Sequence, residues 1–236
     1  GNEATAFTGL FDGFGHNITS LTINRPAEDN VGLVGWNNGT VMNVNLVKGK
    51  IIGSDNVGAL VGHNHGTIDN ATSTTPVIGG SVVGGLVGLN EGGQITNAYA
   101  MGSVTGVSTI GSGVAVAMDL DNDGDIDITG MINSGNIVGG LIGLNAGGQV
   151  ANSYASGGVT GGSILGGLIG LNESGQITNS AASGKITGIS GVGDATFAVN
   201  TAIAADLDRD GTNDVTGNVA GAGTVGGGTI VGGLVG

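Results

Sequence analysis

The chain has 236 residues, of which 53 are glycine and none is cysteine, and its net charge of −13 comes from 18 acidic and 5 basic residues. The glycine content disfavours helical bundles, because each interior glycine costs roughly 1 kcal/mol of helix stability relative to alanine. A disulfide scaffold is excluded. The acidic balance argues against partners such as nucleic acid or anionic membranes, which need basic surfaces. The chain has no apolar run long enough for direct membrane insertion.

A phrase of the form Gly-Leu-[Val/Ile]-Gly, or a close variant, recurs along the chain. Its leucines are Leu33, Leu60, Leu86, Leu141, Leu168 and Leu234. Three of the intervals between successive leucines equal one unit of about 27 residues. The other two, from Leu86 to Leu141 and from Leu168 to Leu234, contain one unit and an insert. We predict that these leucines form one stacked, inward-facing ladder.

Two further landmarks keep the same period. One is an asparagine that follows a β-prone pair, at Asn43, Asn70, Asn97, Asn152 and Asn179. The other is a short apolar step closed by glycine, such as Val104-Thr105-Gly106 and Ile186-Thr187-Gly188. Asparagine tolerates the left-handed backbone conformation and can stack on asparagine one unit away, so we predict a structural role for the first landmark.

Each unit contains three short β-prone pieces, for example VGGLIGLN, then GQVANSYA, then GGVTGG. Three such pieces suit one coil of a three-sided parallel β-helix. Equivalent strands of successive coils would then lie about 4.8 Å apart, with alternate Val, Ile and Leu side chains inside. Without the inserts, about six coils remain, for a rod roughly 30 Å long. The sequence therefore predicts an all-β fold: one β-solenoid domain over 1–236, an excerpt of a longer chain, with inserts at about 107–136 and 189–229.

Each insert contains an acidic loop, Asp-x-Asp-x-Asp-Gly-x-x-Asp, between apolar stretches. Carboxylates at loop positions 1, 3, 5 and 9 and a carbonyl at position 7 are the hard oxygen ligands that Ca²⁺ takes, and glycine at position 6 permits the turn. The ligands predicted in the first loop are Asp119, Asp121, Asp123, the Asp125 carbonyl and Asp127. Those predicted in the second are Asp206, Asp208, Asp210, the Thr212 carbonyl and Asp214. We predict one Ca²⁺ per loop.

The segment GLIGLNESGQITNSAASGKITG, from Gly167 to Gly188, resembles the GLUG repeat of large bacterial surface proteins. The opening FTGLFDGFGHNITSLTIN, from Phe7 to Asn24, resembles the first coil of such regions. GLUG regions occur in filamentous-haemagglutinin-like adhesins and beside some immunoglobulin-A-cleaving metallopeptidases. The resemblance implies an extracellular, cell-surface stalk or adhesin segment without catalysis. Together with the crossover preference of parallel strands, it implies a right-handed coil.

The acidic loops resemble the calcium loops of FG-GAP and VCBS repeats rather than EF-hands. Position 12 is Gly130 or Gly217, so the bidentate glutamate of an EF-hand is missing. In the FG-GAP and VCBS repeats the loop joins two β-strands and takes its last carboxylate from position 9. The resemblance therefore implies that each loop closes a β-hairpin.

The sequence gives little support for a transition-metal site or for catalysis. His63-Asn64-His65 aligns with Leu-Asn-Glu or Leu-Asn-Ala of other units, which predicts a turn, and no third metal ligand is evident beside the two histidines. H-E-x-x-H, G-x-S-x-G and a cysteine nucleophile are all missing, so no catalytic residue is predicted. Sequons occur at Asn17, Asn38, Asn70 and Asn172.

The function predicted from the sequence is a structural or adhesive extracellular segment stiffened by Ca²⁺, whose partners are neighbouring repeats, another copy, or host and cell-surface ligands. One alternative is a filament subunit that stacks end to end through open solenoid ends. A polysaccharide-active β-helix enzyme would need bases or paired carboxylates on one face. An ice-binding solenoid would need an unbroken threonine ladder. Thr105, Thr160 and Thr187 align, but the earlier coils carry Ile52 and Gly79 at or next to that place.

Overall fold

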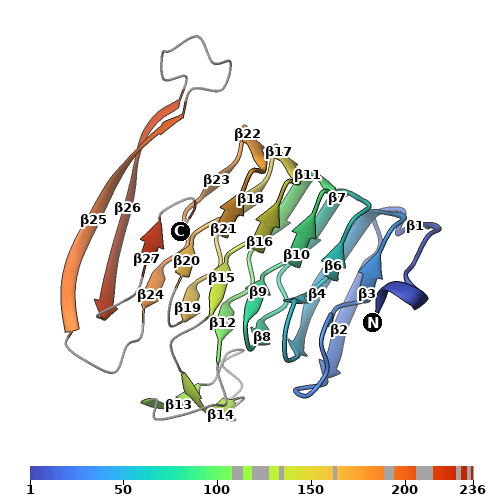
Figure 1. Ribbon diagram of the computed structural model, residues 1–236, viewed down its shortest axis with the longest axis horizontal. Coiled ribbons are helices and arrows are strands. Elements are labelled where there is room, and N and C mark those ends of the chain that lie inside the picture. The colour runs from blue at the N-terminus through green and yellow to red at the C-terminus, as the bar shows by residue number, and fades with distance from the viewer. Residues whose placement is uncertain are drawn as a thin grey trace.

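The computed structural model describes residues 1–107, 114–118, 128–132, 136–161, 164–188, 194–205, 215–226, 230–232 and 235. Its fold is all-β: among the described residues, the regular elements are one 3₁₀ helix, η1 (Glu3–Thr5), and strands. Parallel strands of successive coils lie side by side from the N-terminal to the C-terminal end (Figure 1) and form a β-solenoid of about six turns. The predicted fold class is therefore confirmed.

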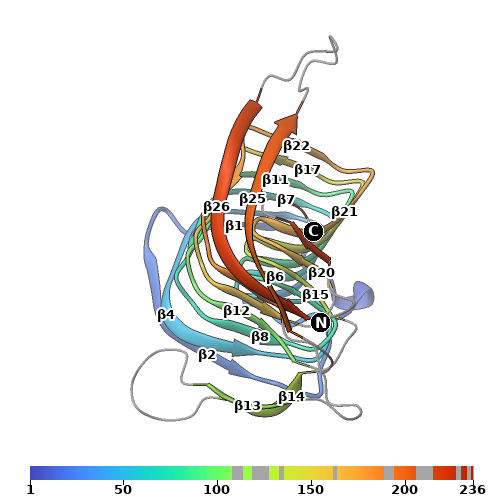
Figure 2. The same cartoon turned by 90° about the vertical axis from the view of Figure 1, so that its left-hand side faces the viewer.

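Three parallel sheets make up the walls of the solenoid. The first contains β3 (Val34–Asn37), β6 (Val61–Asn64), β10 (Val87–Glu91), β16 (Ile142–Ala146) and β21 (Ile169–Glu173). The second contains β5 (Val57–Gly58), β9 (Val82–Gly84), β15 (Ile137–Gly139), β20 (Ile164–Gly166) and β27 (Ile230–Gly232). A view turned by 90° shows strands of successive coils one behind another (Figure 2).

The third sheet is larger because the long strand β4 (Thr40–Ile52) links two sets of shorter strands. One set is β7 (Thr67–Ser73), β11 (Gln94–Ala100), β17 (Gln149–Ala151), β18 (Tyr154–Ala155), β22 (Gln176–Thr178) and β23 (Ala181–Ala182). The other is β8 (Val77–Gly79), β12 (Val104–Gly106), β19 (Val159–Gly161) and β24 (Ile186–Gly188).

The first strand of the predicted coil is in fact two strands. The phrase VGGLIGLN was expected to be one piece, but β15 ends at Gly139 and β16 begins at Ile142, in different sheets. The chain turns sharply at this point: a Cβ on Gly139 would lie 1.8 Å from the Ile142 carbonyl oxygen. Only glycine fits such a corner, so the glycine at the end of β15 marks a change of sheet.

The leucine ladder faces inward as predicted, as far as it is described. Leu60, Leu86, Leu141 and Leu168 are fully buried, and Leu33 is partly buried against the same core. Leu234 lies outside the described residues. Since one core runs through successive coils, no coil buries its apolar face alone, and stability is shared along the stack.

The periodic asparagines, for which a structural role was predicted, occupy corners. Asn43, Asn70, Asn97, Asn152 and Asn179 all have positive φ, between 46° and 54°. We call this column the corner ladder. Its side chains bond from coil to coil: Asn70 Nδ2 donates to Asn43 Oδ1 at 2.7 Å, and Asn43 Nδ2 donates to Asp12 Oδ1 at 2.9 Å. The predicted left-handed conformation is confirmed, and the stacking extends to an aspartate.

The sheet register continues across both long segments between coils. Val87 pairs with Ile142 across the first segment, and Ile164 pairs with Ile230 across the second. Within these segments lie two antiparallel pairs: β13 (Val114–Met118) with β14 (Ile128–Ile132), and β25 (Asp194–Ala205) with β26 (Val215–Gly226). Both pairs occur between a strand of the third sheet and the next strand of the second sheet.

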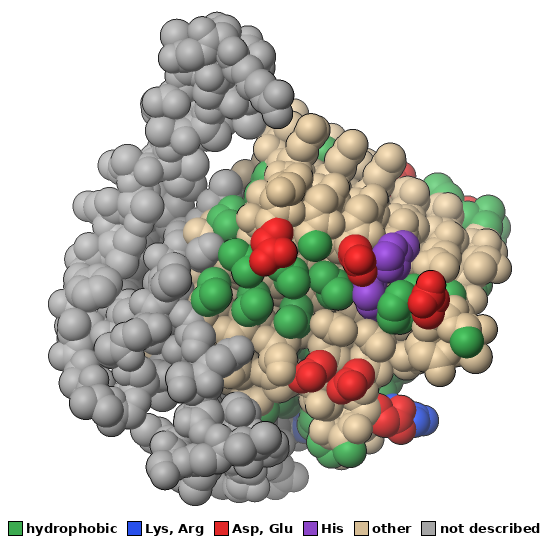
Figure 3. All heavy atoms as spheres, viewed as in Figure 1, with side chains coloured by type: hydrophobic (Ala, Val, Ile, Leu, Met, Phe, Trp, Pro, Cys, Tyr) green, Lys and Arg blue, Asp and Glu red, His purple; other side chains and the backbone are tan. Residues whose placement is uncertain are grey.

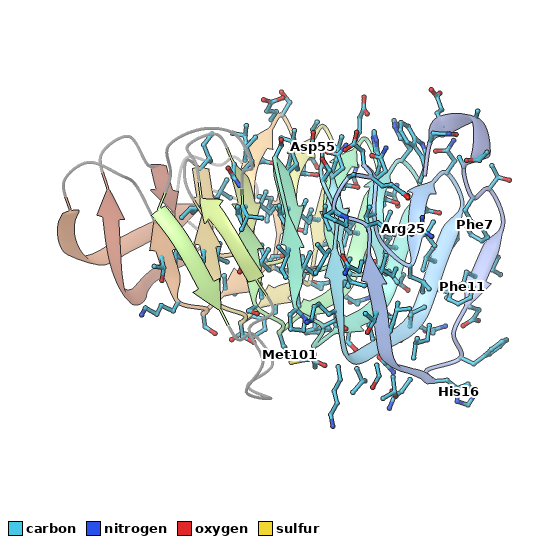
Figure 4. All side chains as sticks on the ribbon, turned by 90° about the horizontal axis from the view of Figure 1, so that it is seen from below. Phe7, Phe11, His16, Arg25, Asp55 and Met101 are labelled. Atoms are coloured by element: carbon cyan, nitrogen blue, oxygen red, sulfur yellow. The ribbon has the colours of Figure 1, made fainter. Side chains whose placement is uncertain are left out.

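The first coil is formed by β1 (Leu10–Asp12) and β2 (Asn17–Asn24), which both pair in parallel with β4. Phe7 and Phe11, labelled near the N-terminal end in Figure 4, pack against the end of the core. Among the residues that the structure describes, no helix is long and apolar enough to cross a membrane.

Candidate functional site

A second asparagine column lies inside the first sheet. It consists of Asn37, Asn64, Asn90, Asn145 and Asn172, and we call it the inner ladder. Its first four members are fully buried. Each Nδ2 donates to the Oδ1 of the next asparagine, at 2.7–2.8 Å between donor and acceptor. The column is a continuous hydrogen-bonded chain through five successive coils.

The inner ladder also fixes the turn that follows each strand. Asn90 Nδ2 donates to the Gly93 carbonyl at 3.1 Å, and Asn145 Nδ2 donates to the Gly148 carbonyl at 3.2 Å. A Cβ on Gly148 would lie 2.0 Å from Asn90 Nδ2, so this glycine is required by the ladder. A buried amide is costly to leave unpaired, so movement of a strand end that breaks these hydrogen bonds is unfavourable. The ladder therefore holds the strand ends in place.

His63 and His65 flank Asn64, whose side chain points into the inner ladder. Because side chains alternate along a strand, both histidines face outward. The expectation of a turn was wrong for His63, which lies in β6, and right in part for His65, which directly follows the strand. The backbone is fixed here too: the amide of His65 donates to the Asn37 carbonyl at 2.8 Å.

The third candidate ligand, which was missed in the sequence, is Glu91, in the next coil. Its Oε2 lies 2.9 Å from His63 Nε2 and 3.2 Å from His65 Nε2. Asn90 pairs with Asn64, so Glu91 follows in the register beside His65. Among the described residues, these three side chains form a group that could hold a metal ion, with ligand atoms within 4.8 Å of one another.

Trp36, in the preceding coil, forms the other wall of this cluster. Its ring centroid lies 3.8 Å from that of His63 and 5.5 Å from that of His65, and the two imidazoles lie 4.7 Å apart. The side chain of His63 is 7% exposed, whereas those of His65 and Glu91 are 37% and 53% exposed. Three successive coils therefore contribute to one half-open cluster, hereafter the His–Glu cluster.

Burial dominates the electrostatics of His63. It lowers the pKa of this imidazole below its usual value of 6.5, against the opposing effect of the hydrogen bond to Glu91. The nearby His65 lowers it further. His63 is therefore neutral near pH 7, and its Nε2–H donates to Glu91; an ion bound at Nε2 would replace this proton.

The same outward column becomes apolar in the later coils. His63 aligns with Leu89, and Leu89 with Leu144 and then Leu171, all half-buried. Figure 3 shows a hydrophobic patch beside the histidines and acidic side chains on this face. The His–Glu cluster is thus confined to the N-terminal coils.

All ten predicted calcium ligands, in the loops 119–127 and 206–214, lie outside the described residues. The structure describes the strands that lead into them. β13 and β14 pair up to Met118 and Ile128, and β25 and β26 pair up to Ala205 and Val215. Each acidic loop therefore joins two antiparallel strands.

The parallel sheets, the shared core and the coil-to-coil asparagines define a β-solenoid repeat protein. The family model of the GLUG motif matches residues 79–105 and 161–187. Each match covers one coil, and the GLUG resemblance inferred from the sequence is confirmed for these two coils.

One solved structure shares the fold: a Bacteroides ovatus protein whose crystal structure carries the name "putative immunoglobulin A1 protease". The alignment has a TM-score of 0.57 and 20% sequence identity, and covers 96% of this chain and 68% of the other. At this identity the likeness concerns the fold alone. A comparison with curated proteins gave no match.

Proposed function

We propose that this structural repeat region is a stiff extracellular spacer in an adhesin or surface fibre, and that each insert binds one Ca²⁺. The observation that carries the proposal is the unbroken register across both inserts, with Val87 on Ile142 and Ile164 on Ile230. Because the coils stack without a break across the inserts, the solenoid can act as a spacer of fixed length while the inserts bind ions.

The backbone of the inserts supports the calcium part of the proposal. Each acidic loop spans nine residues, whereas hairpin loops without ligands usually have 2–5. Nine of the chain's 18 acidic residues fall in these two loops. Because clustered carboxylates repel one another, two Ca²⁺ ions would stabilise both loops by neutralising part of this charge.

The role we propose is not catalytic. The metallopeptidases found beside GLUG regions carry H-E-x-x-H, which is missing from this sequence. The protease named for the Bacteroides ovatus structure is therefore no guide to the activity of this chain.

Calcium binding is tested by calorimetric titration of chelator-stripped protein. We expect two sites, one of which disappears in Asp121→Ala and the other in Asp208→Ala. Asp125→Ala is the matched control, because position 7 contributes its backbone carbonyl rather than its side chain. No calcium-dependent heat, or equal loss in Asp121→Ala and Asp125→Ala, would contradict the proposed ligand set.

The independence of the spacer is tested by removing the inserts. Uninterrupted coils join β8 to β9 through Gly80-Ser81, and β19 to β20 through Gly162-Ser163. Replacing 107–136 and 189–229 by Gly-Ser should therefore leave a folded stack with the same β-sheet circular dichroism per coil. Loss of cooperative unfolding in this variant would show that the inserts are part of the stack.

The extracellular location is tested separately, with an antibody against the stack. Labelling of intact, unpermeabilised source cells is expected. Labelling only after permeabilisation would refute the surface role.

A further inference from the structure

We propose that His63, His65 and Glu91 form a binding site for a transition-metal dication of the Zn²⁺ class, separate from the acidic loops. The site has three protein ligands from two adjacent coils and one coordination position open to solvent. It extends the proposed function to a second kind of metal ion.

The spacing of the three ligand atoms fits such an ion. Donors about 2.0–2.1 Å from a tetrahedral Zn²⁺ lie about 3.3 Å from one another. Glu91 Oε2 is already 2.9 Å and 3.2 Å from the two imidazole Nε2 atoms. All three ligand atoms lie within 4.8 Å of one another, so side-chain rotations that bring each pair to about 3.3 Å would place an ion between them.

The donor types select the class of ion. Two imidazole nitrogens and one carboxylate oxygen suit Zn²⁺, Cu²⁺, Ni²⁺ or Fe²⁺, whereas Ca²⁺ and Mg²⁺ prefer oxygen ligands throughout. Ca²⁺ would accordingly go to the acidic loops and leave this cluster to the softer ion.

The surroundings hold the ligands in place before an ion arrives. Asn64, between the two histidines, donates to Asn90 and accepts from Asn37, each at 2.8 Å. Trp36 packs on the buried His63 ring and limits its rotation. The exposed His65 and Glu91 leave an entry path and room for water as the fourth ligand.

The experiment is a calorimetric titration of the intact chain with ZnCl₂, with Ca²⁺ in excess to saturate any hard-ion sites. One Zn²⁺ per chain is expected. Glu91→Gln and His65→Ala should each weaken binding by at least about tenfold, the effect that loss of even an outer-sphere partner has on zinc sites. Circular dichroism confirms that each variant is folded, which is expected because both substituted residues are partly exposed.

Two matched controls should leave binding unchanged. Glu173→Gln changes a glutamate in the same register column two coils away, where Glu91 aligns with Ala146 and Ala146 with Glu173. His16→Ala changes the remaining histidine of the chain. Equal affinity of Glu91→Gln and Glu173→Gln, or absence of zinc binding in the wild type, would overturn the proposal.

Trp36 provides an independent readout, because it is the chain's single tryptophan. Cu²⁺ bound at the cluster should quench its fluorescence, since its ring lies 3.8 Å from that of His63. His65→Ala should abolish the quenching at the same Cu²⁺ concentration, whereas Asp121→Ala should leave it intact. Quenching lost in Asp121→Ala but retained in His65→Ala would assign the ion to the acidic loop and overturn the proposal.

Discussion

The inner and corner asparagine ladders have the same residue type and nearly the same spacing, yet they stabilise the solenoid in different ways. The inner ladder is buried and bonds amide to amide at 2.7–2.8 Å. The corner ladder is partly or fully exposed, and its Asn179–Asn152 contact is 3.4 Å long. Its members are needed mainly for their positive φ. Periodicity alone therefore does not distinguish a buried hydrogen-bond network from a backbone requirement.

Truncation of a buried leucine should give the largest loss of stability in this comparison. Leu141 is fully buried within the continuous core. Leu141→Ala should lower the free energy of unfolding by about 2–5 kcal/mol, as truncation of buried leucines does elsewhere. The measurement is denaturant unfolding followed by circular dichroism. A loss below about 0.5 kcal/mol would be too small for a core position.

Breaking the inner ladder should cost nearly as much. Asn90→Ala removes the acceptor of Asn64 and the donor to Asn145, both within the buried column. We expect a loss of about 3 kcal/mol, because a buried polar group left unpaired costs about 1–3 kcal/mol. The same unfolding assay measures it, and Asn90→Gly should be at least as destabilising. A nearly neutral Asn90→Ala would mean that water replaces the missing amide.

The corner ladder should respond differently to the same pair of substitutions. Asn152 has a φ of 51°. Asn152→Ala should cost about 1 kcal/mol, because a Cβ is strained in the left-handed region, and Asn152→Gly should be nearly neutral. Denaturant midpoints of the two variants, compared with those at position 90, give the test. If Asn152→Gly were as damaging as Asn152→Ala, the side chain rather than the backbone would matter.

The smallest effect is expected where the corner ladder begins. The hydrogen bond from Asn43, together with that from the Phe14 amide, lowers the pKa of Asp12 below 3.8. A carboxyl with a lowered folded pKa adds stability above its unfolded value, and this contribution is lost as the pH falls through the folded pKa. In Asn43→Ala the Asp12 pKa should rise toward 3.8 in a carboxyl NMR titration, while Asn179→Ala should leave it unchanged. An unchanged Asp12 titration in Asn43→Ala would exclude this coupling.

Much of the fold was predictable because a solenoid repeats its own local rules. The leucine phrase predicted the inward ladder, and asparagine's tolerance of positive φ predicted the corners. The split of VGGLIGLN was missed because a glycine pair is compatible with either a strand or a change of sheet. Only the backbone contact at Gly139 distinguishes the two.

The inner ladder and the His–Glu cluster were missed for a related reason. Asn64 and Asn90 align in the unit, but their position after a strand indicated a turn rather than a buried column. Glu91 is a whole coil away from His63 along the chain, and only the pairing of Asn90 with Asn64 brings it within reach. The aligned triplets His63-Asn64-His65 and Leu89-Asn90-Glu91 contained this signal. The calcium loops remain predictions.

The connection between the third and second sheets also determines how far apart the inserts lie along the solenoid. It is only Gly80-Ser81 between β8 and β9, but it expands to 107–136 and to 189–229 at the two inserts, while the coils on both sides keep their pairing. β12 and β24, which precede the two long connections, are separated by β19, so these connections start two strand spacings apart, about 10 Å. Loops grafted at this corner of different coils would therefore lie at multiples of the strand spacing, about 4.8 Å.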